Sequence, residues 1–375
     1  MKRIAAGFVK VNRITLLKAA RSGTHNPKIS IKMKYNLLGN TGLLVSELCL
    51  GTMTFGGSGT SMWASIGQLD QEPVDQLVKR SVDAGINFID TANVYSEGVS
   101  EKLTGQAIRN LGLHRDDLVI ATKVRGKMGE GPNQIGLSRK HIIHQAEESL
   151  RRLNTDYIDL YQIHGFDFLT PLEETLRALD DLVSSGKVRY IGCSNLAAWH
   201  LMKALSYSEH KDLAKFVSLQ AYYTIAGRDL EREVVPLLLD QKVGLMVWSP
   251  LAGGLLSGKY GRNKQPEDSR RVTFDFPPVN KEKAYDILDV MEPMAAEKGI
   301  SVAQIALAWL LHQPVVTTVI IGAKKPEQLE DNLKAVDVVL SADELKKLDE
   351  ISKLAPEYPG WMVDRQSGDR KKYIG

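Results

Sequence analysis

The chain has 375 residues, of which 43% are hydrophobic, 25% charged and 7% aromatic. These fractions are those of an ordinary globular protein and exclude a disordered, collagen-like or disulfide-stapled chain. The two cysteines, Cys49 and Cys193, lie far apart and are expected to be buried thiols in a reducing compartment, so we expect a cytoplasmic protein. No apolar run approaches the roughly 20 residues that span a bilayer, and we therefore expect no membrane partner.

The formal net charge of +3 is produced by the first residues of the chain. Residues 1–34 carry nine Lys and Arg residues and neither Asp nor Glu. The remaining chain holds 39 basic and 45 acidic residues, a net charge of −6. A mildly acidic body without a basic stripe argues against nucleic acid as a partner.

The basic segment 1–34 has three interpretations. Its composition is typical of a mitochondrial transit peptide, but it also fits a basic arm, or an upstream start with Met33 as the true first residue. It lacks the apolar region and the small-residue cleavage site of a secretory signal. We favour a tail or an early start site, and we expect residues 35–375 to form a single domain.

From residue 35 onward, short apolar and β-branched runs alternate with amphipathic helical stretches. Eight runs are predicted to be strands: Glu47–Thr52, Ile86–Asp90, Leu118–Lys123, Ile158–His164, Val188–Ser194, Val217–Gln220, Gly244–Ser249 and Thr317–Gly322. Thr170 to Glu173 predicts a helix start, with a capping box and Pro171 at the first helical position. Further helix starts and ends are predicted at Ser301…Gln304, Ser341…Glu344, Gly85 and Gly186.

Eight strands that alternate with helices pair in parallel through right-handed crossovers. The choice lies between a closed (β/α)8 TIM barrel and an open doubly wound sheet. The number of strands and the even spacing of the first six units favour the barrel, and Gly51–Gly57 lacks the G-x-G-x-x-G spacing of a dinucleotide-binding sheet. Residues 253–280 are predicted to form a long loop after the seventh strand, followed by an extra helical segment before the eighth. We also expect an extra C-terminal helix.

Four titratable residues follow three consecutive predicted strands at the same end. Asp90 ends the second strand and Tyr95 comes five residues later, while Lys123 and His164 end the third and fourth. In a (β/α)8 barrel the carboxyl ends of all strands face one shared site, so we expect these side chains to meet there. One polar strand end could be a solvated cap, but their common position favours a catalytic group.

These four residue types suit the reduction of a carbonyl group. A Lys123 ammonium stabilises a phenolate, so we expect the Tyr95 proton to leave nearer neutral pH, with Asp90 holding Lys123. A neutral His164 could donate a hydrogen bond to the carbonyl oxygen. No serine nucleophile motif is present. His141 and His144 are spaced for one helix face but lack a third ligand nearby, so we expect no metal.

Residues after the later strands could hold a phosphate-bearing hydride donor. The glycines of Trp248–Lys259, after the seventh strand, allow backbone N–H groups to approach a phosphate. Gly322–Pro326 follows the eighth strand and opens a helix, which is a natural anion site. Barrels commonly bind phosphate at these two loops.

The sequence resembles the aldo-keto reductase family from about Tyr35 to Lys353. The specific stretches are Asn87–Ala92 with Tyr95, Ala121–Lys123, Asp159–His164, Val188–Asn195, Ser249–Leu251 and Pro326–Asn332. The resemblance implies a (β/α)8 barrel that binds NADPH without a dinucleotide-binding sheet. It also implies a catalytic tetrad of Asp90, Tyr95, Lys123 and His164, with Tyr95 as proton donor. The long loop and the tail resemble the branch of bacterial general reductases and potassium-channel beta subunits more than the classical aldose reductase branch.

The resemblance also implies a set of cofactor-binding residues: Ser194, Asn195, Gln220, Tyr223, Ser249, Leu251, Gly254, Lys259, Gly322, Lys324, Gln328, Asp331 and Asn332. The first three would hold the carboxamide of NADPH, and Tyr223 would stack on the nicotinamide. The Ser249–Lys259 loop would cover the pyrophosphate. Lys324 would meet the 2′-phosphate, and Gln328 and Asn332 would reach the adenine.

Three functions remain open at this stage. The first is NADPH-dependent reduction of an aldehyde or ketone substrate to an alcohol, which we favour. The second is a nucleotide-sensing regulatory subunit built on the same barrel, and the third is a non-redox barrel enzyme that acts on phosphorylated substrates. The substrate and the oligomeric state, including a homo-oligomer, are left open. Side chains expected to line the substrate site are Met53, Trp63, Phe166 and Trp361.

Overall fold

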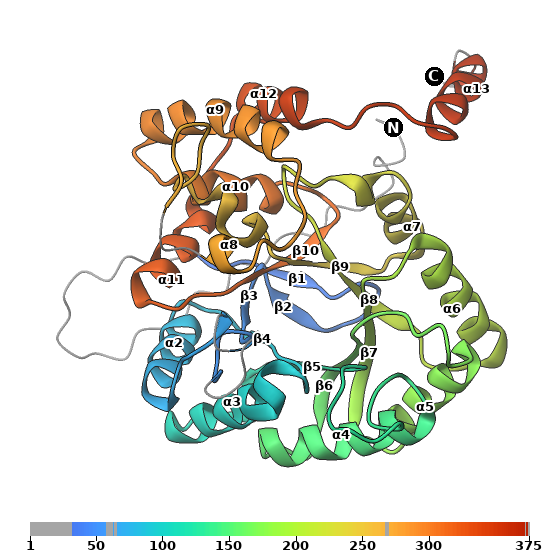
Figure 1. The fold of residues 1–375 in the computed structure, drawn as a ribbon. Helices are drawn as coiled ribbons and strands as arrows, with labels where there is room; N and C mark the ends of the chain where they lie inside the picture. The colour runs from blue at the N-terminus through green and yellow to red at the C-terminus, as the bar shows by residue number, and fades with distance from the viewer. Residues whose placement is uncertain (1–31, 58–62, 64–65, 267–269, 372, 374–375) are drawn as a thin grey trace.

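Eight parallel strands close into a barrel in the order β10-β3-β4-β5-β6-β7-β8-β9, as Figure 1 shows. The computed structural model describes residues 32–57, 63, 66–266, 270–371 and 373. All eight predicted strands are present, and their ends lie within two residues of the predicted ones. The strands are β3 Leu48–Gly51, β4 Phe88–Asp90, β5 Val119–Val124, β6 Ile158–Ile163, β7 Val188–Ser194, β8 Phe216–Tyr222, β9 Gly244–Trp248 and β10 Val316–Ile321. The predicted (β/α)8 architecture is confirmed.

Helices surround the barrel and connect its strands. Those that follow the strands in turn are α2 Gln71–Asp83, α3 Val99–Asn110, α4 Arg139–Leu153, α5 Leu172–Ser184, α6 Ala198–Lys211, α7 Val234–Gln241, α10 Val302–Leu311 and α11 Pro326–Leu333. Additional helices are α8 Arg270–Thr273, α9 Lys281–Lys298, α12 Ala342–Ser352 and α13 Gly360–Lys371. Short 3-10 turns are η2 Tyr95–Gly98, η3 Arg115–Asp117, η4 Asp229–Glu231, η5 Ala252–Ser257 and η6 Lys334–Asp337. The predicted excursion after the seventh strand and the extra helices after it are therefore present.

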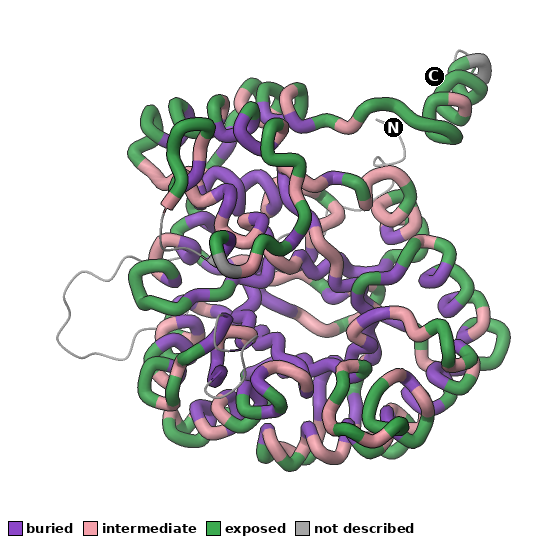
Figure 2. Tube along the Cα trace, in the orientation of Figure 1, coloured by how far each residue is buried: buried purple, intermediate pink, exposed green. Residues whose placement is uncertain are grey.

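Burial on both faces explains why the strands read as continuous apolar runs. Every residue of β5 and β6 is buried, and Figure 2 shows the buried tube concentrated on the strands and on the helix faces against them. One apolar cluster fills the barrel interior, and a larger one lies between barrel and helices. The amphipathic stripe predicted after Pro171 faces that outer cluster, with Leu172, Leu176, Leu179 and Leu182 buried.

A hairpin that the sequence did not predict closes one end of the barrel. Its strands, β1 Tyr35–Leu37 and β2 Leu44–Ser46, pair antiparallel. Leu38 and Val45 from this hairpin are fully buried in the interior cluster, together with Phe88 and Leu160 of the barrel strands. The amino end of the barrel is thereby filled, which leaves the carboxyl ends of the strands for a site.

The predicted helix boundaries hold with two exceptions. Gly85 and Gly186 follow α2 and α5 with positive φ angles, and Ser341 forms the predicted capping box with Glu344. Thr170 does not cap α5, because its hydroxyl donates to Asp167 at 2.7 Å and the helix begins one residue later than predicted. Ser301 caps α10 through the backbone N–H of Gln304, but the Gln304 side chain bonds elsewhere.

Both ends of the chain differ from the predicted domain limits. Met33 is 5% exposed and packs in the outer cluster, and Lys34 exchanges hydrogen bonds with Glu47, so the fold begins before residue 35. At the other end, α13 lies beyond α12 and away from the barrel in Figure 1. Trp361 on this helix packs against Tyr358, with ring centroids 6.0 Å apart. The prediction that Trp361 lines the substrate site is therefore wrong.

No single helix in the described part of the chain is long and apolar enough to cross a membrane. Among the described helices, α9 and α10 taken together meet that length and composition, and they are bent by 100° at the break between them.

Candidate active site

The structure brings the four predicted catalytic side chains together at the carboxyl end of the barrel. Lys123 Nζ lies 2.5 Å from Asp90 Oδ2 and 3.3 Å from Tyr95 Oη. The Tyr95 and His164 rings meet edge to face, with centroids 5.8 Å apart and an interplanar angle of 76°. These residues come from β4, β5, η2 and the residue after β6, so the parallel pairing of three neighbouring strands assembles the group.

Local backbone geometry sets the position of Tyr95. The turn η2 begins at Tyr95, and Ser96 and Glu97 follow with φ angles of 47° and 57°, in the left-handed region. The Ser96 hydroxyl donates to the carbonyl oxygen of Phe55 at 3.0 Å, which ties this turn to the loop after β3. From that loop, Trp63 packs edge-on against the Tyr95 ring at 5.9 Å. Trp63 therefore lies at the site, as predicted.

Lys123 is a fully buried ammonium whose hydrogen-bonding capacity is satisfied. Its third acceptor, besides Asp90 and Tyr95, is the carbonyl oxygen of Thr91 at 2.8 Å. An ammonium has three N–H donors, and a buried charge is tolerated only when it is paired and fully bonded. Burial alone would lower the pKa of Lys123. Asp90 and Tyr95 raise this pKa by more than burial lowers it, so the net shift is upward. Lys123 is thus held charged inside the barrel, with Asp90 as its hydrogen-bonded partner.

The pKa of Tyr95 differs from the one predicted from the sequence. Burial raises the pKa of the Tyr95 phenol, and the opposing effect of Lys123 does not cancel this rise. The expected net lowering toward neutral pH is therefore wrong for this state of the protein. Lys123 still reduces the rise, because a nearby positive charge favours the phenolate. Tyr95 is accordingly a protonated hydroxyl at neutral pH, with a cation beside its oxygen.

His164 is neutral at physiological pH. Burial lowers the pKa of its imidazole to about 3, and the positive charges of Lys123 and Arg125 add to this effect. The neutral state agrees with the prediction for this residue. A neutral imidazole carries one N–H and can donate a hydrogen bond without bringing a second buried charge next to Lys123.

The second carboxylate oxygen of Asp90 accepts hydrogen bonds from two glutamines. Gln162 Nε2 and Gln220 Nε2 lie 3.0 Å and 2.9 Å from Asp90 Oδ1. Gln162 is fully buried and was not among the predicted site residues. The sequence held one signal for Gln162, which is a lone amide in a mostly apolar strand. Because side chains alternate along a strand, Gln162 projects to the same side as His164, two residues later.

Two of the predicted carboxamide-binding residues lie at the end of β7 and contact one another. Ser194 Oγ donates to the backbone oxygen of Gln220 at 2.9 Å, and Asn195 Nδ2 donates to Ser194 Oγ at 3.0 Å. Trp248 Nε1 donates to Asn195 Oδ1 at 3.0 Å, which places the indole beside this group. The structure therefore joins the ends of β7, β8 and β9 next to the Asp90 network.

The position of Tyr223 contradicts the prediction that it stacks on the nicotinamide. Its hydroxyl donates to Glu231 at 2.7 Å, and its ring packs against Trp309 in the outer cluster, with 1% of its surface exposed. It therefore faces the surrounding helices rather than the barrel mouth. Tyr222 is on the same face of β8 as Gln220, and its ring lies 5.2 Å from that of Trp248. The predicted strand ended at Gln220, and the two further residues of β8 decide which tyrosine faces inward.

The loop after β9 exposes backbone N–H groups in an unusual conformation. Ser249, Gly254 and neighbouring residues have positive φ angles, and a Cβ added at Gly254 would meet no atom within 4 Å. Arg271 holds the loop by donating to the carbonyl oxygens of Ala252 and Pro277 at 2.6 Å and 3.0 Å. Leu251 is half-buried and Lys259 is exposed on the same loop. Successive N–H groups in such turns form concave anion sites.

The turn after β10 lies beside that loop, because β9 and β10 are neighbours. Gly322, Lys324 and Gln328 are exposed, and Gln328 Oε1 accepts a hydrogen bond from the Lys324 backbone N–H at 2.9 Å. Asn332 is 7% exposed on α11. The open glycine turn, the basic side chain and the amide groups fit a phosphate-bearing nucleotide in chemistry and placement.

Asp331 has a structural contact that the sequence did not predict. Its carboxylate accepts hydrogen bonds from Ser301 Oγ at 2.7 Å and from Gln304 Nε2 at 2.6 Å. These bonds link α11 to the first turn of α10.

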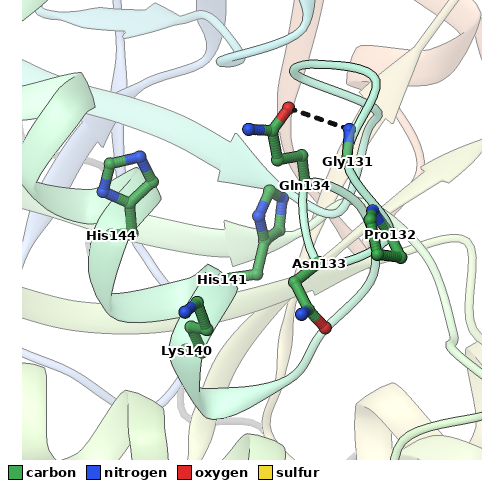
Figure 3. Close-up of a pocket in the computed structure, with 7 residues that line it drawn as sticks. All are labelled: Gly131, Pro132, Asn133, Gln134, Lys140, His141 and His144. Atoms are coloured by element: carbon green, nitrogen blue, oxygen red, sulfur yellow. Dashed lines mark hydrogen bonds between the residues drawn. The ribbon is translucent and has the colours of Figure 1, made fainter.

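A separate pocket of about 350 Å³ lies beside the start of α4, as Figure 3 shows. His141 and His144 line it together with Lys140 and the loop residues Gly131 to Gln134. In Figure 3 the two imidazoles project from successive turns of the helix. Within the described ranges, no group of three or more His, Cys, Asp or Glu residues is placed to hold a metal ion.

Comparison with known proteins agrees with the fold. The profile of the aldo/keto reductase family matches residues 47–353, so the chain belongs to the aldo/keto reductase family. It is 38% identical to a probable voltage-gated potassium channel subunit beta of Arabidopsis thaliana, over 87% of this chain and 99% of that protein. It is 39% identical to the uncharacterized oxidoreductase YrpG of Bacillus subtilis, over 85% of this chain and 96% of that protein. The versiconal hemiacetal acetate reductase of Aspergillus parasiticus is 35% identical, over 85% and 96% of the two chains.

Proposed function

We propose that this protein reduces aldehydes or ketones to alcohols, with NADPH as the hydride donor and Tyr95 as the proton donor. The observation that carries the proposal is the contact of Tyr95 Oη with Lys123 Nζ at 3.3 Å, beside the neutral His164 ring. A protonated phenol next to a buried cation suits the transfer of a proton to a developing alkoxide. Family membership supports an oxidoreductase of this class.

The chain's own residues account for the movement of the proton. Tyr95 Oη gives its proton to the carbonyl oxygen as the carbonyl carbon receives the hydride, so the Tyr95 O–H bond breaks and the alcohol O–H bond forms. The phenolate that remains is stabilised by Lys123, and solvent returns the proton afterwards. His164 donates its N–H to the same carbonyl oxygen and orients the substrate. When bound, the reduced nicotinamide supplies the hydride.

The choice of cofactor is part of the proposal. Ser194, Asn195 and Gln220 would hold the carboxamide, with Trp248 and Tyr222 in the place expected of Tyr223. The loop after β9 would cover the pyrophosphate. Lys324 and the start of α11 would meet the 2′-phosphate that distinguishes NADPH from NADH, because an ammonium and the positive end of the helix dipole both favour a dianion. Gln328 and Asn332 would lie on the adenine side, and Asp331 would support that side through α11.

The cellular setting completes the proposal. Cys49 and Cys193 are buried free thiols, which supports a reducing compartment such as the cytoplasm. The partner is a small carbonyl compound.

A second function is favoured by one specific observation. Two relatives, from Arabidopsis thaliana and Oryza sativa, match this chain over almost their entire length. Both are described as probable voltage-gated potassium channel beta subunits. A nucleotide-sensing subunit could retain the same side chains, so the two functions differ in turnover and not in the site. Slow cofactor release with little turnover would favour sensing.

The deciding experiment is a panel of aldehydes and ketones with the purified full chain, followed by NADPH absorbance. We expect steady turnover in the wild type and a loss of about 10²- to 10⁴-fold in Tyr95→Phe, since this change removes the acid and little packing. Retained NADPH binding in Tyr95→Phe, measured by fluorescence quenching, shows an intact cofactor site. Turnover of Tyr95→Phe within about threefold of the wild type would exclude Tyr95 as the acid. Cofactor carried through gel filtration without turnover would favour the sensing function.

A further inference from the structure

Arg125 lies at the mouth of the barrel, next to the proposed reacting groups. It directly follows β5 and stands two residues after Lys123. Its Nε donates to the carbonyl oxygen of Phe166 at 2.9 Å, and Phe166 stands two residues after His164. One hydrogen bond therefore joins the loops after β5 and β6 through the Arg125 side chain. The same positive charge lowers the pKa of His164, which is consistent with this closeness.

The guanidinium of Arg125 is exposed and forms no ion pair with any described carboxylate within 4 Å. The nearby carboxylate is that of Asp167, whose oxygens accept hydrogen bonds from Leu137 N, Leu169 N and Thr170 Oγ1. Other arginines of the barrel are paired differently, since Arg115 and Arg152 each contact a carboxylate oxygen at 2.6 Å. The remaining N–H groups of Arg125 are thus available to an anion that enters the mouth.

The backbone at Arg125 is held in a conformation that side chains rarely adopt. Its φ angle is 144°, where glycine is favoured, although Gly126 is the next residue. Strained backbone of this kind persists where the surrounding structure enforces it, and such positions cluster at functional sites. The carbonyl oxygen of Arg125 accepts a hydrogen bond from Gly136 N at 2.9 Å, which fixes the base of the loop.

The barrel topology separates Arg125 from the proposed cofactor phosphates. In the closed order of eight strands, β5 lies opposite β9 and β6 lies opposite β10 (Figure 1). The glycine loop and the Lys324 turn follow β9 and β10, whereas Arg125 joins the loops after β5 and β6. An anion at Arg125 therefore belongs to the substrate and not to the dinucleotide.

We propose that Arg125 binds the carboxylate of the substrate, so that the preferred substrates are carbonyl compounds that carry a carboxylate. This inference rests on the proposed function and deepens it. Arg matches a carboxylate with two parallel N–H donors, which orients the carbonyl toward Tyr95 and His164. The rings of Phe166 and His200 stack at 3.8 Å next to this position, with Phe168 and Trp199 exposed beside them, and offer an apolar flank to an aromatic substrate body.

The test compares a charged probe, 4-carboxybenzaldehyde, with its uncharged methyl ester. We expect the wild type to favour the acid in kcat/KM by about tenfold or more, since a charge-assisted hydrogen bond contributes about 10- to 100-fold in affinity. Arg125→Gln should bring the ratio of acid to ester close to unity, mainly through the KM of the acid. Lys127→Gln is the matched control, because Lys127 lies on the same loop, is exposed and pairs with Glu130. Its ratio should equal that of the wild type.

A second variant tests whether a loss of preference in Arg125→Gln comes from misfolding. Arg125→Gly accepts a φ of 144° without strain, which offsets the loss of the hydrogen bond to Phe166, so it should melt near the wild-type temperature and still lose the preference for the acid. A preference that survives in Arg125→Gly, or that falls equally in Lys127→Gln, would overturn the inference.

A binding measurement separates this inference from the proposed function. We expect 4-(hydroxymethyl)benzoate to quench tryptophan fluorescence at lower concentration than its methyl ester in the wild type, and this difference to vanish in Arg125→Gln. Absence of turnover with the binding preference intact would remove the proposed function and leave the Arg125 site standing. Equal binding of the two compounds by the wild type, with normal aldehyde turnover, would remove the Arg125 site alone.

Discussion

Gln162 and Gln220 donate to the same oxygen atom, Oδ1 of Asp90, from β6 and β8. Their amides also approach each other, with Gln220 Nε2 and Gln162 Oε1 3.5 Å apart. Lys123 takes the other oxygen of Asp90. Three donors therefore share one carboxylate, and a residue proposed to bind the cofactor is linked to the pair that stabilises Tyr95.

The first prediction concerns Gln162→Met, which keeps the volume of the side chain and removes its donor. Asp90 then loses one of its hydrogen bonds and draws the Lys123 proton more strongly, so the Tyr95 phenolate is less stabilised. Alcohol oxidation, the reverse reaction, needs that phenolate. We expect the apparent pKa of kcat/KM for oxidation to rise by about half a unit or more. A shift of this size corresponds to a modest part of the free energy of a charged hydrogen bond.

The matched control for Gln162→Met is Tyr161→Phe on the same strand. Tyr161 is buried and donates to the carbonyl oxygen of Ile142 at 3.3 Å, outside the barrel interior. Its loss should lower the melting temperature and leave the pH profile in place. Identical pH profiles for Gln162→Met and the wild type would show that Gln162 only fills space.

The second prediction concerns pH and stability through His164. Its pKa is about 3 in the folded protein against an ordinary value of 6.5, so the unfolded chain binds more protons between these values. The free energy of unfolding then falls as the pH drops below 6.5. The contribution of this residue is about 1.4 kcal/mol per pH unit at most, until the pH approaches 3.

Chemical denaturation at a pH of about 7.5 and about 5.5 measures this effect. The wild type should lose about 1.4 kcal/mol more than His164→Gln between these two conditions, because glutamine does not titrate. An equal loss in the two proteins would mean that other groups carry the pH dependence.

The third prediction concerns the start of the fold. A chain that begins at Met33 should keep the melting temperature and the activity of the full chain, because it retains Met33, the first buried side chain among the residues that the structure describes. A chain that begins at Tyr35 loses Met33, whose burial contributes about 1.5–3 kcal/mol, and should melt several degrees lower. Calorimetry on the two truncated chains and on Met33→Ala compares them. A large drop for the chain that begins at Met33 would make the basic segment structural.

The fourth prediction concerns the choice between NADPH and NADH. Lys324→Ala should weaken NADPH about ten- to a hundredfold and leave NADH nearly unchanged, because only NADPH has a 2′-phosphate for the ammonium. The preference should also shrink as the salt concentration rises, since an exposed charge contact is screened. Fluorescence titration of both cofactors on both proteins measures the ratio. Equal wild-type affinities, or equal losses in the variant, would contradict the assignment of Lys324.

The sequence determined the local elements and the set of chemical groups. Strand runs, the capping box at Ser341 and the glycines at Gly85 and Gly186 follow from patterns within a few residues, and the structure confirms them. Asp90, Lys123 and His164 could be identified because each ends a predicted strand, and parallel strands of a closed barrel present such ends together.

Only the tertiary structure decided which neighbours those groups have. The inward face of Tyr222, the burial of Tyr223 against Trp309 and the hydrogen bond from Arg125 to Phe166 each depend on where a strand stops and how a loop returns. The upward pKa shift of Tyr95 likewise depends on desolvation, which is set by packing from segments distant in sequence. Periodicity reports which residue types alternate, whereas burial and electrostatic environment arise from the packing of the whole barrel.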